Sequence, residues 1–419
     1  MNRREVLAGS LLSMLVRPSG FASAAVPCPP TSLSLDKGDV AYATTSCFSG
    51  VPPLWYQNMP DATWSSIASV GTIDSVKPAL HPGGVYESNG PIIAWGGAAF
   101  DTKRSALMIG SQGGHGDYYG NEMYSLLINQ SQPVWQRITA PRYAFNSTEP
   151  YMDDMSPRAV HSGSQIVYAE NVDKYVLAMM PFMAPNGNSS RKLFAFDCNT
   201  KTWGEMQSPP SGDSGYATGS QDAYGGSCYD PVTRSIWMVQ SSSWRSTCRF
   251  DPSTGLYTVF DIFNNQGFDG VAALSPSKRI MIYLNGHVHG HDGSFVWLDL
   301  NKPEAGWQTA ASISGSPLSG RGSSLVWHEG SSAFVGWRGS GAGLVKLVPP
   351  SNLYSGDWRW VDISPGSSNK ISPTKANNTG TYGRFALATN ISNSGRDCLI
   401  LINASTEPTF VFKLPVGGL

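Results

Sequence analysis

The residues best suited to chemistry lie in one glycine-rich segment, 113–122, which reads Gly-Gly-His-Gly-Asp-Tyr-Tyr-Gly-Asn-Glu. Apolar runs with strand character flank it at 106–110 and 123–128, so a hairpin with polar groups at its tip is predicted. The imidazole of His115 and the neighbouring phenols can take and give protons near neutral pH. We therefore interpret the segment as a candidate acid–base loop; the alternative is that His115 only hydrogen-bonds backbone in a tight turn.

A unit of four strands repeats along the chain and would arrange such loops in a ring. The full units span about 91–141, 157–203, 224–262, 267–313 and 319–365, and the fourth strand usually carries a Trp. The last unit, from residue 382, has three strands, and the stretch 62–67 can supply the fourth. We predict an all-β propeller of about six four-stranded blades, the last closed by this N-terminal strand. Seven blades are the alternative if 71–90 contains strands.

The N-terminal residues have the features of a targeting segment. Arg3 and Arg4 precede a short, weakly apolar stretch, and Ala22-Ser23-Ala24 offers a small-residue cleavage site. We predict a twin-arginine-like signal peptide over 1–24, with an ordinary secretory signal as the alternative. An irregular N-terminal arm over 25–60 and a single propeller domain over 61–419 follow, and the mature protein is expected in the periplasm or outside the cell.

Composition limits the partners that the protein can have. The 419 residues carry a formal net charge of −1, and only 14% of them are charged. A non-specific nucleic-acid binder would carry a basic surplus, and a membrane-spanning helix would need a longer apolar run than any present. We therefore expect no nucleic-acid or membrane partner. A monomer is also expected, although the sequence does not establish the oligomeric state.

The six cysteines form no CxxC pair, which argues against a zinc ribbon or a thioredoxin-like site. An oxidising destination would permit disulfides. Cys28 with Cys47, both in the N-terminal arm, is the preferred pair, and Cys228 with Cys248 is a weaker one.

The repeat resembles kelch-type propeller units, which have glycine-rich turns and a fourth-strand Trp. The 113–122 loop, taken with Arg158 and His161 in the next unit, is similar to a motif of bacterial propeller polysaccharide lyases of the ulvan-lyase type. This resemblance implies an exported lyase that cleaves a uronic-acid-containing polysaccharide by β-elimination.

In a propeller, the start of each inner strand and the loop between the second and third strands open on one face. Arginines and aromatic rings at those places suit a carboxylated sugar, because guanidinium groups bind oxyanions and flat rings stack on pyranoses. The predicted catalytic residues are His115 as base or acid, Tyr224 as its partner, Arg245 and Arg158 on the carboxylate, and His161 in orientation or proton transfer. The predicted substrate-binding residues are Tyr118, Tyr119, Asn121, Trp244, His287, His289, Arg321, Arg338, Tyr382 and Arg384.

Other readings of these residues stay open. Arg158 and His161 can equally serve contacts between blades, and Glu122 is expected to brace its loop. His287, His289 and His291 would share one side of an extended strand and could ligate a metal, although a polar loop is favoured. No cofactor is predicted, with structural calcium or a His-bound metal as alternatives. The alternative functions are a non-catalytic carbohydrate- or protein-binding propeller and, ranked lower, a metal-dependent oxidoreductase.

Overall fold

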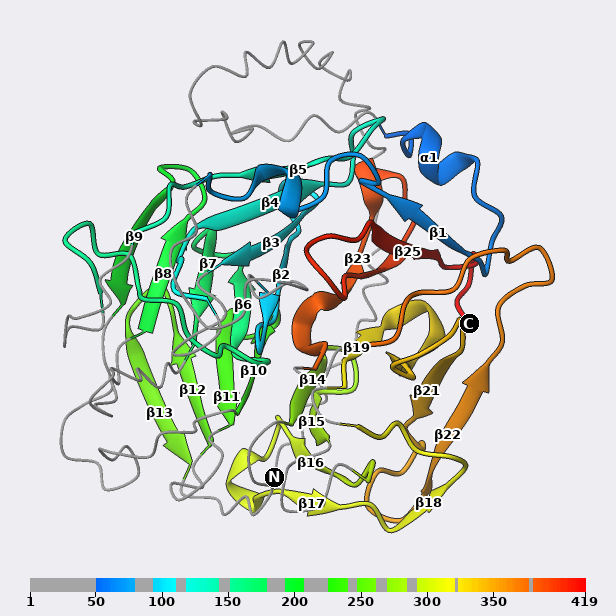
Figure 1. Ribbon diagram of the computed structural model, residues 1–419. Helices are drawn as coiled ribbons and strands as arrows, with labels where there is room; N and C mark the ends of the chain where they lie inside the picture. Colours follow the sequence, from blue (N-terminus) through cyan, green and yellow to red (C-terminus); the bar gives the residue numbers. More distant parts are fainter. Residues whose placement is uncertain are drawn as a thin grey trace, which may run out of the picture.

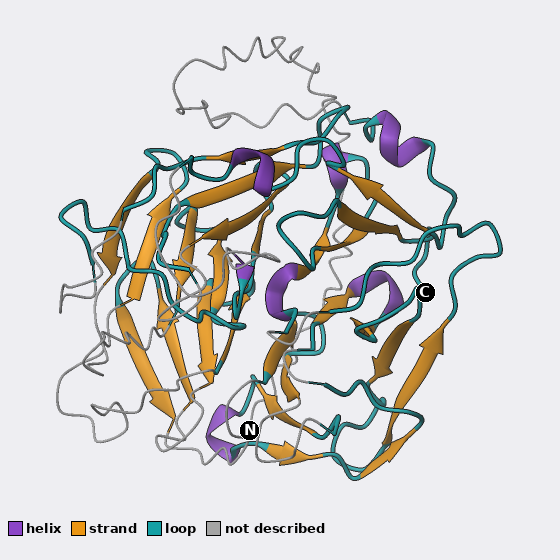
Figure 2. Cartoon of the chain, in the orientation of Figure 1, coloured by secondary structure: helices purple, strands orange, loops and turns teal. Residues whose placement is uncertain are grey.

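The computed structural model describes residues 50–79, 93–110, 118–142, 151–178, 193–206, 225–239, 247–260, 270–284, 292–320, 323–376 and 380–419. Within these ranges the chain forms six antiparallel blades around a common centre (Figure 1). Strands dominate, and the helices are single short turns (Figure 2). The prediction of a six-bladed, all-β propeller is confirmed, and the residues predicted as a signal peptide lie outside the described ranges.

The blades follow one another along the chain. Blade 1 contains β2 (Ala99–Asp101), β3 (Ala106–Gly110), β4 (Met123–Leu127) and β5 (Trp135–Arg137). Blade 2 contains β6 (Ile166–Ala169), β7 (Lys174–Leu177), β8 (Leu193–Asp197) and β9 (Thr202–Met206). Blade 3 contains β10 (Gly226–Asp230), β11 (Ser235–Val239), β12 (Thr247–Asp251) and β13 (Leu256–Phe260). Blade 4 contains β14 (Val271–Ser275), β15 (Ile280–Leu284), β16 (Phe295–Asp299) and β17 (Gln308–Thr309).

Blade 5 contains β19 (Leu325–His328), β20 (Ala333–Trp337), β21 (Leu344–Val348) and β22 (Asp357–Ile363), with β18 (Ser312–Ser314) added outside them. Blade 6 contains β23 (Phe385–Ala388), β24 (Cys398–Leu401), β25 (Thr409–Lys413) and β1 (Trp64–Ile67). The short helices are α1 (Leu54–Gln57), η1 (Asp74–Val76), η5 (Pro303–Ala305), η6 (Glu329–Ser331), η7 (Tyr382–Arg384) and η8 (Ile391–Asn393).

The ring closes through the N-terminal strand, as predicted. β1 pairs antiparallel with β25, from Trp64 opposite Phe412 to Ile67 opposite Thr409. The outer position of the last blade is therefore filled by residues from the other end of the described chain, which ties the two ends of the ring together. The adjoining part of the predicted irregular arm includes α1, whose Trp55 indole donates to the carbonyls of Ile128 and Gln130 in blade 1.

β18 is a departure from the predicted boundaries. The sequence repeat assigns residues up to about 313 to the fourth unit, whereas Ser312–Ser314 pair in parallel with β22 of blade 5. The hydroxyls of Ser312 and Ser314 donate to the two carboxylate oxygens of Asp357 at 2.7 and 2.6 Å. A linker strand therefore covers the outer edge of blade 5, which would otherwise present unpaired backbone groups.

The core lies between neighbouring blades, where both faces of most strands are buried. Tryptophans in or directly before the fourth strand join one blade to the preceding one. The indole N–H of Trp135 donates to the Thr409 hydroxyl at 3.0 Å, and that of Trp307 donates to the Thr247 hydroxyl at 2.8 Å. The recurring Trp of the repeat thus has a structural role at the blade interfaces.

The four described cysteines are buried thiols, so the weaker predicted disulfide, Cys228 with Cys248, is wrong. These residues lie on the two strands that flank β11, opposite Trp237 and Met238 respectively. Successive residues of a strand point to opposite faces, so the two thiols point toward different neighbouring blades. The preferred pair, Cys28 and Cys47, lies outside the described residues. Among the described residues, no helix is long and apolar enough to cross a membrane.

Candidate functional site

The six inner strands, β2, β6, β10, β14, β19 and β23, surround the centre of the ring and all begin at the same end of it (Figure 1). We call this end the entry face. In blade 1, Ala99 at the start of β2 pairs with Met108, and the antiparallel β3–β4 pair extends beyond it to Gly110 opposite Met123. The second and third strands therefore meet at the entry face, which is where the sequence places the chemistry-bearing loops.

Several predicted site residues lie outside the described part of the chain. They are His115, Tyr224, Trp244, Arg245, His287, His289, His291 and Arg321. The strand ends that flank these residues are described, and those of 111–117, 240–246 and 285–291 belong to second and third strands at the entry face. The other predicted residues, from Tyr118 to Arg384, have defined positions.

The exit of the 111–117 segment is tied to blade 2. The Asn121 amide donates to the Pro157 carbonyl at 2.8 Å and to the Ser156 hydroxyl at 3.0 Å. The Asn121 side-chain oxygen accepts from the Arg142 backbone N–H at 2.7 Å. Asn121, predicted to bind substrate, therefore uses its side chain to connect blades 1 and 2. Arg158 directly follows Pro157, whose carbonyl accepts from the Asn121 amide.

Arg158 and His161 are both buried where the chain enters blade 2, each 8% exposed. The His161 ring lies 5.3 Å from the Trp95 ring, with 31° between their planes. Trp95 has a positive φ of 51°, a conformation that most residues avoid. Its carbonyl accepts from Gly163 N–H at 2.8 Å, so this unusual turn of blade 1 is held directly against blade 2 beside the imidazole.

The close approach of these two blades requires glycine at residue 97. A Cβ added to Gly97 would lie 2.3 Å from the Gly163 carbonyl oxygen. The Gly97 N–H instead donates to the Ser162 hydroxyl at 3.3 Å. Backbone contacts therefore set the position of His161 relative to Trp95, on the same face as the candidate loop.

A buried carboxyl lies beneath the loop's exit. The hydroxyls of Tyr118 and Tyr124 both donate to Oε1 of Glu122, the latter at 2.6 Å. Burial raises the pKa of Glu122, and the two phenol hydrogen bonds only partly offset this rise. The expectation that Glu122 braces its loop agrees with these contacts. Tyr118, predicted to bind substrate, is 2% exposed with its hydroxyl engaged by Glu122, whereas Tyr119 is half-buried.

Tyr382 and Arg384 were predicted to bind substrate, but each is 1% exposed. Arg384 donates through Nε to the Gly96 carbonyl of blade 1 at 2.8 Å and through Nη2 to the Gly380 carbonyl. Burial lowers the pKa of Arg384 to about 10. The group therefore stays cationic near neutral pH, beneath the surface of the entry face, where it joins the last blade to the first. The short η7 turn that buries both side chains was not apparent from the sequence pattern.

Arg338, on the loop between β20 and β21, has its donors engaged. Its guanidinium contacts Asp362 at 2.6 Å and donates to the carbonyls of Ser316 and Pro317 at 2.9 and 2.7 Å. These contacts hold the linker between blades 4 and 5. Arg338, predicted to bind substrate, therefore has a structural role in these contacts.

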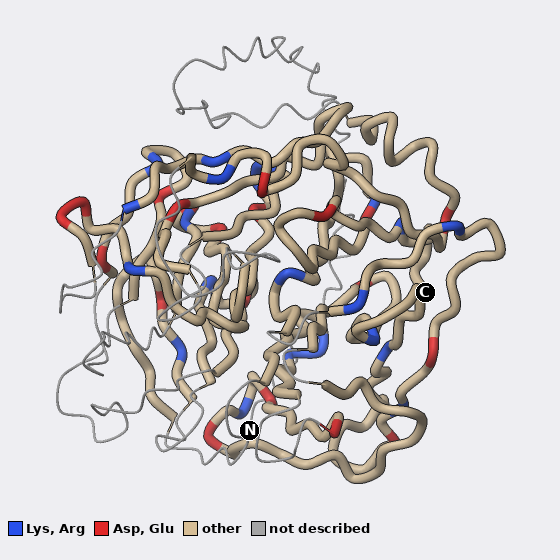
Figure 3. Tube along the Cα trace, in the orientation of Figure 1, with Lys and Arg blue, Asp and Glu red and all other residues tan. Residues whose placement is uncertain are grey.

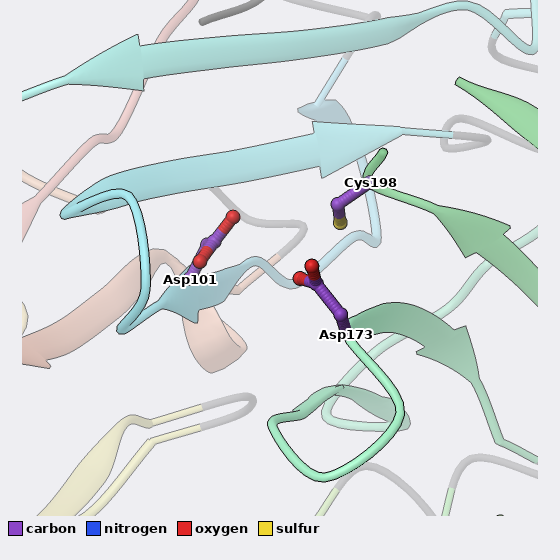
Figure 4. Close-up of side chains that lie close together, drawn as sticks. All are labelled: Asp101, Asp173 and Cys198. Atoms are coloured by element: carbon purple, nitrogen blue, oxygen red, sulfur yellow. The ribbon is translucent and has the colours of Figure 1, made fainter. Parts of the chain in front are cut away.

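The opposite end of the ring carries a charged cluster that the sequence analysis missed. We call this end the turn face, since the turn from the first to the second strand of each blade lies there. Ligand atoms of Asp101, Asp173 and Cys198 lie within 4.8 Å of one another (Figure 4). Arg104 donates to Asp101 at 2.8 Å and to both oxygens of Asp173 at 2.7 and 2.9 Å. The arrangement is therefore an ion-pair cluster between blades, and the guanidinium takes the carboxylate oxygens that a metal would need.

A second pair of the same kind joins blades 3 and 4. The Arg279 guanidinium donates to both carboxylate oxygens of Asp230, each at 2.8 Å. Burial by itself would raise the pKa of Asp230, but the hydrogen bonds from Arg279 and Thr233 outweigh it and lower the pKa. In the sequence, such a pair is indicated by an Asp at the end of an inner strand and an Arg in a later turn. Which two turns become neighbours depends on how the blades are arranged in the ring.

Charged residues of both signs are scattered over the blades, with no sector reserved for one sign (Figure 3). This agrees with the near-zero net charge of the chain. The local pairing of charges, rather than their overall number, distinguishes the two faces.

No protein-family model and no curated protein matches the chain. Solved structures that it resembles include YjhT, with 10% identity over 75% of this chain and 72% of that chain and a TM-score of 0.27. Another is U3-55K, with 11% identity over 76% and 80% of the two chains and a TM-score of 0.36. A third is a structural-genomics protein of unknown function from Bacteroides thetaiotaomicron, with 10% identity over 84% and 75% and a TM-score of 0.42. The propeller assignment rests on the sheet topology.

Proposed function

We propose that this protein is an exported polysaccharide lyase that cleaves an acidic, uronic-acid-containing polymer at the entry face. The observation that carries the proposal is the bond from Asn121 to the Pro157 carbonyl at 2.8 Å. It holds the end of the loop that carries His115 one residue from Arg158, with His161 on the same stretch. Arg158 and His161 thus lie in sequence just after the residue that holds Asn121, and we assign the His115 imidazole to the same region.

These residue types match the three demands of β-elimination. A base removes the proton on the carbon next to the carboxylate, and the electron pair forms a double bond as the glycosidic C–O bond breaks. A cation on the carboxylate offsets the negative charge that builds up, and an acid gives a proton to the leaving oxygen. We assign proton transfer to His115 with Tyr224, and carboxylate binding to Arg158 with Arg245; His161 orients the sugar.

The buried charge of Arg384 supports an anionic substrate. It donates to the carbonyls of Gly96 and Gly380, and no ion pair joins it to a carboxylate among the described residues. A cation held in a weakly polar interior without a counter-charge raises the electrostatic potential nearby, which favours an approaching polyanion. Arg384 would act through this potential, without touching the sugar.

The test is incubation with a panel of uronic-acid polymers, ulvan included, while the ultraviolet absorbance of the unsaturated product is followed. Wild-type protein should produce it, His115→Ala should lower kcat by about 100-fold or more, and Arg158→Ala should lower kcat as well as raise KM. Matched unfolding curves would show that the variants fold. Binding of these polymers without any unsaturated product would contradict the lyase and favour the non-catalytic carbohydrate-binding alternative. A fully active His115→Ala would remove the loop from the mechanism.

A further inference from the structure

Glu122 lies in a setting that disfavours its ionised form. It is 2% exposed, and both phenol donors, from Tyr118 and Tyr124, are directed at the same oxygen, Oε1. Oε2 is buried and has no hydrogen-bond partner among the described residues. As a carboxylate, the group would be a buried anion with one oxygen unsolvated; as a neutral acid, it keeps both phenol bonds and carries no charge.

Among the described residues, one cation lowers the pKa of Glu122 through its charge. Arg137, half-buried on β5, is the positive group that lowers the pKa of Glu122, while Tyr118 and Tyr124 are the other titratable groups that face it. Burial raises the pKa of Glu122 in spite of all three, so the neutral form is favoured over a wider pH range than for an exposed Glu.

The backbone at Gly120 packs directly against the Glu122 carboxyl. A Cβ at Gly120 would lie 2.3 Å from Oε2 of Glu122 and 2.5 Å from the Tyr118 ring, so only glycine fits there. Tyr118 is the first described residue after the 111–117 segment. At the segment's other end, the Tyr175 hydroxyl donates to the Gly110 carbonyl at 3.3 Å. Glu122 is therefore the polar centre on which the exit of the segment is fixed.

We propose that Glu122 is a positioning residue for the lyase reaction proposed above: its neutral carboxyl, held by Tyr118 and Tyr124, fixes the exit of the His115 loop. Ionisation of Glu122 loosens that exit. This inference rests on the proposed function for its effect on catalysis, but its structural part stands apart from it. The residue acts through the loop and does not touch the substrate.

Two substitutions separate this role from simple packing. Glu122→Gln keeps a neutral side chain and an oxygen for both phenols, whereas Glu122→Ala leaves two buried hydroxyls without their acceptor. Glu122→Ala should lower kcat by about 100-fold with little change in KM, because small displacements of a reacting group cost that much. Glu122→Gln should stay within about threefold of wild type at acidic pH and lose less activity as pH rises. The exposed Glu304→Gln is the control, and its pH profile should match wild type.

The proposal is overturned if Glu122→Gln loses as much activity as Glu122→Ala, or if its alkaline limb coincides with that of wild type. Amide hydrogen exchange of residues 119–124, corrected for intrinsic rates, gives a readout that needs no substrate. Protection should fall with rising pH in wild type, stay constant in Glu122→Gln and be low throughout in Glu122→Ala. If amide protection in Glu122→Gln falls with rising pH as much as it does in wild type, the positioning role is contradicted. Absence of lyase activity together with the expected exchange pattern would sink only the proposed function.

Discussion

The two faces of the ring treat buried charge in opposite ways. At the turn face, Arg104 and Arg279 each bind an aspartate of a neighbouring blade through two nitrogens, so these buried carboxylates face an opposite charge. At the entry face, the buried Arg384 donates to the carbonyls of Gly96 and Gly380, which are neutral acceptors. Paired charges hold blades together, but their electrostatic potentials largely cancel at a distance, so they attract a charged ligand weakly. A charge bonded only to carbonyls keeps its field, which suggests that the turn face stabilises the ring and the entry face carries the function.

The largest effect should follow from breaking the turn-face cluster. Arg104→Ala leaves Asp101 and Asp173 buried at 0% and 8% exposure without their shared guanidinium. We expect a loss of about 3–5 kcal/mol in the free energy of unfolding, measured by denaturant titration. A loss below about 1 kcal/mol would mean that the cluster is not what holds blades 1 and 2 together.

Acid should weaken the turn face through Asp230 of its second ion pair. The lowered pKa of Asp230, in which hydrogen bonds from Arg279 and Thr233 outweigh the opposing effect of burial, contributes stability that is complete above the unfolded pKa. That stability is lost as pH falls below about 4. Asp230→Asn should flatten this part of the dependence of Tm on pH, and an unchanged acid limb would contradict the assignment.

At the entry face, Arg384→Met should cost less than Arg104→Ala. The substitution removes hydrogen bonds to carbonyls but strands no carboxylate, so we expect about 1–2 kcal/mol in the free energy of unfolding. The same variant should bind an acidic polymer more weakly and with a smaller dependence on salt, measured by titration at two ionic strengths. A larger stability loss than that of Arg104→Ala would reverse the contrast between the faces.

The smallest change in stability is expected for Tyr175→Phe. It deletes one hydroxyl, whose bond to the Gly110 carbonyl is 3.3 Å long, so the loss should be below about 1 kcal/mol. Because this bond lies at the start of the segment that carries His115, we expect kcat to fall measurably although the free energy of unfolding changes little. Negligible changes in both kcat and the free energy of unfolding would show that the bond from Tyr175 to Gly110 does not position the segment.

The blade number and the closing strand could be predicted from the sequence because both follow from local repeats. Apolar alternation, turn residues and the fourth-strand Trp recur in each unit, and the last unit lacks a strand that 62–67 can provide. The Cys228–Cys248 hypothesis failed because it ignored which face of its strand each thiol occupies.

Contacts between blades were harder to predict because they depend on the ring. Arg104 meets Asp173 only when two turns from different blades become neighbours, and nothing within either turn indicates this. Arg384 has the residue type of a sugar ligand, yet the backward turn at Tyr382, with a φ of 47°, places it in the interior. Of the candidate site, the sequence predicted that the inner-strand starts and the loops between second and third strands share one face, but not which side chains there make structural contacts.

The most direct test of the account is a hydrogen-exchange footprint of an acidic uronic-acid oligosaccharide on the protein. We predict protection at the entry face, over residues 118–122 and 156–163, with no change at the turn face over 101–104 and 170–173. Protection confined to the turn face, or none at saturating oligosaccharide, would contradict the central claim that the entry face recognises an acidic sugar.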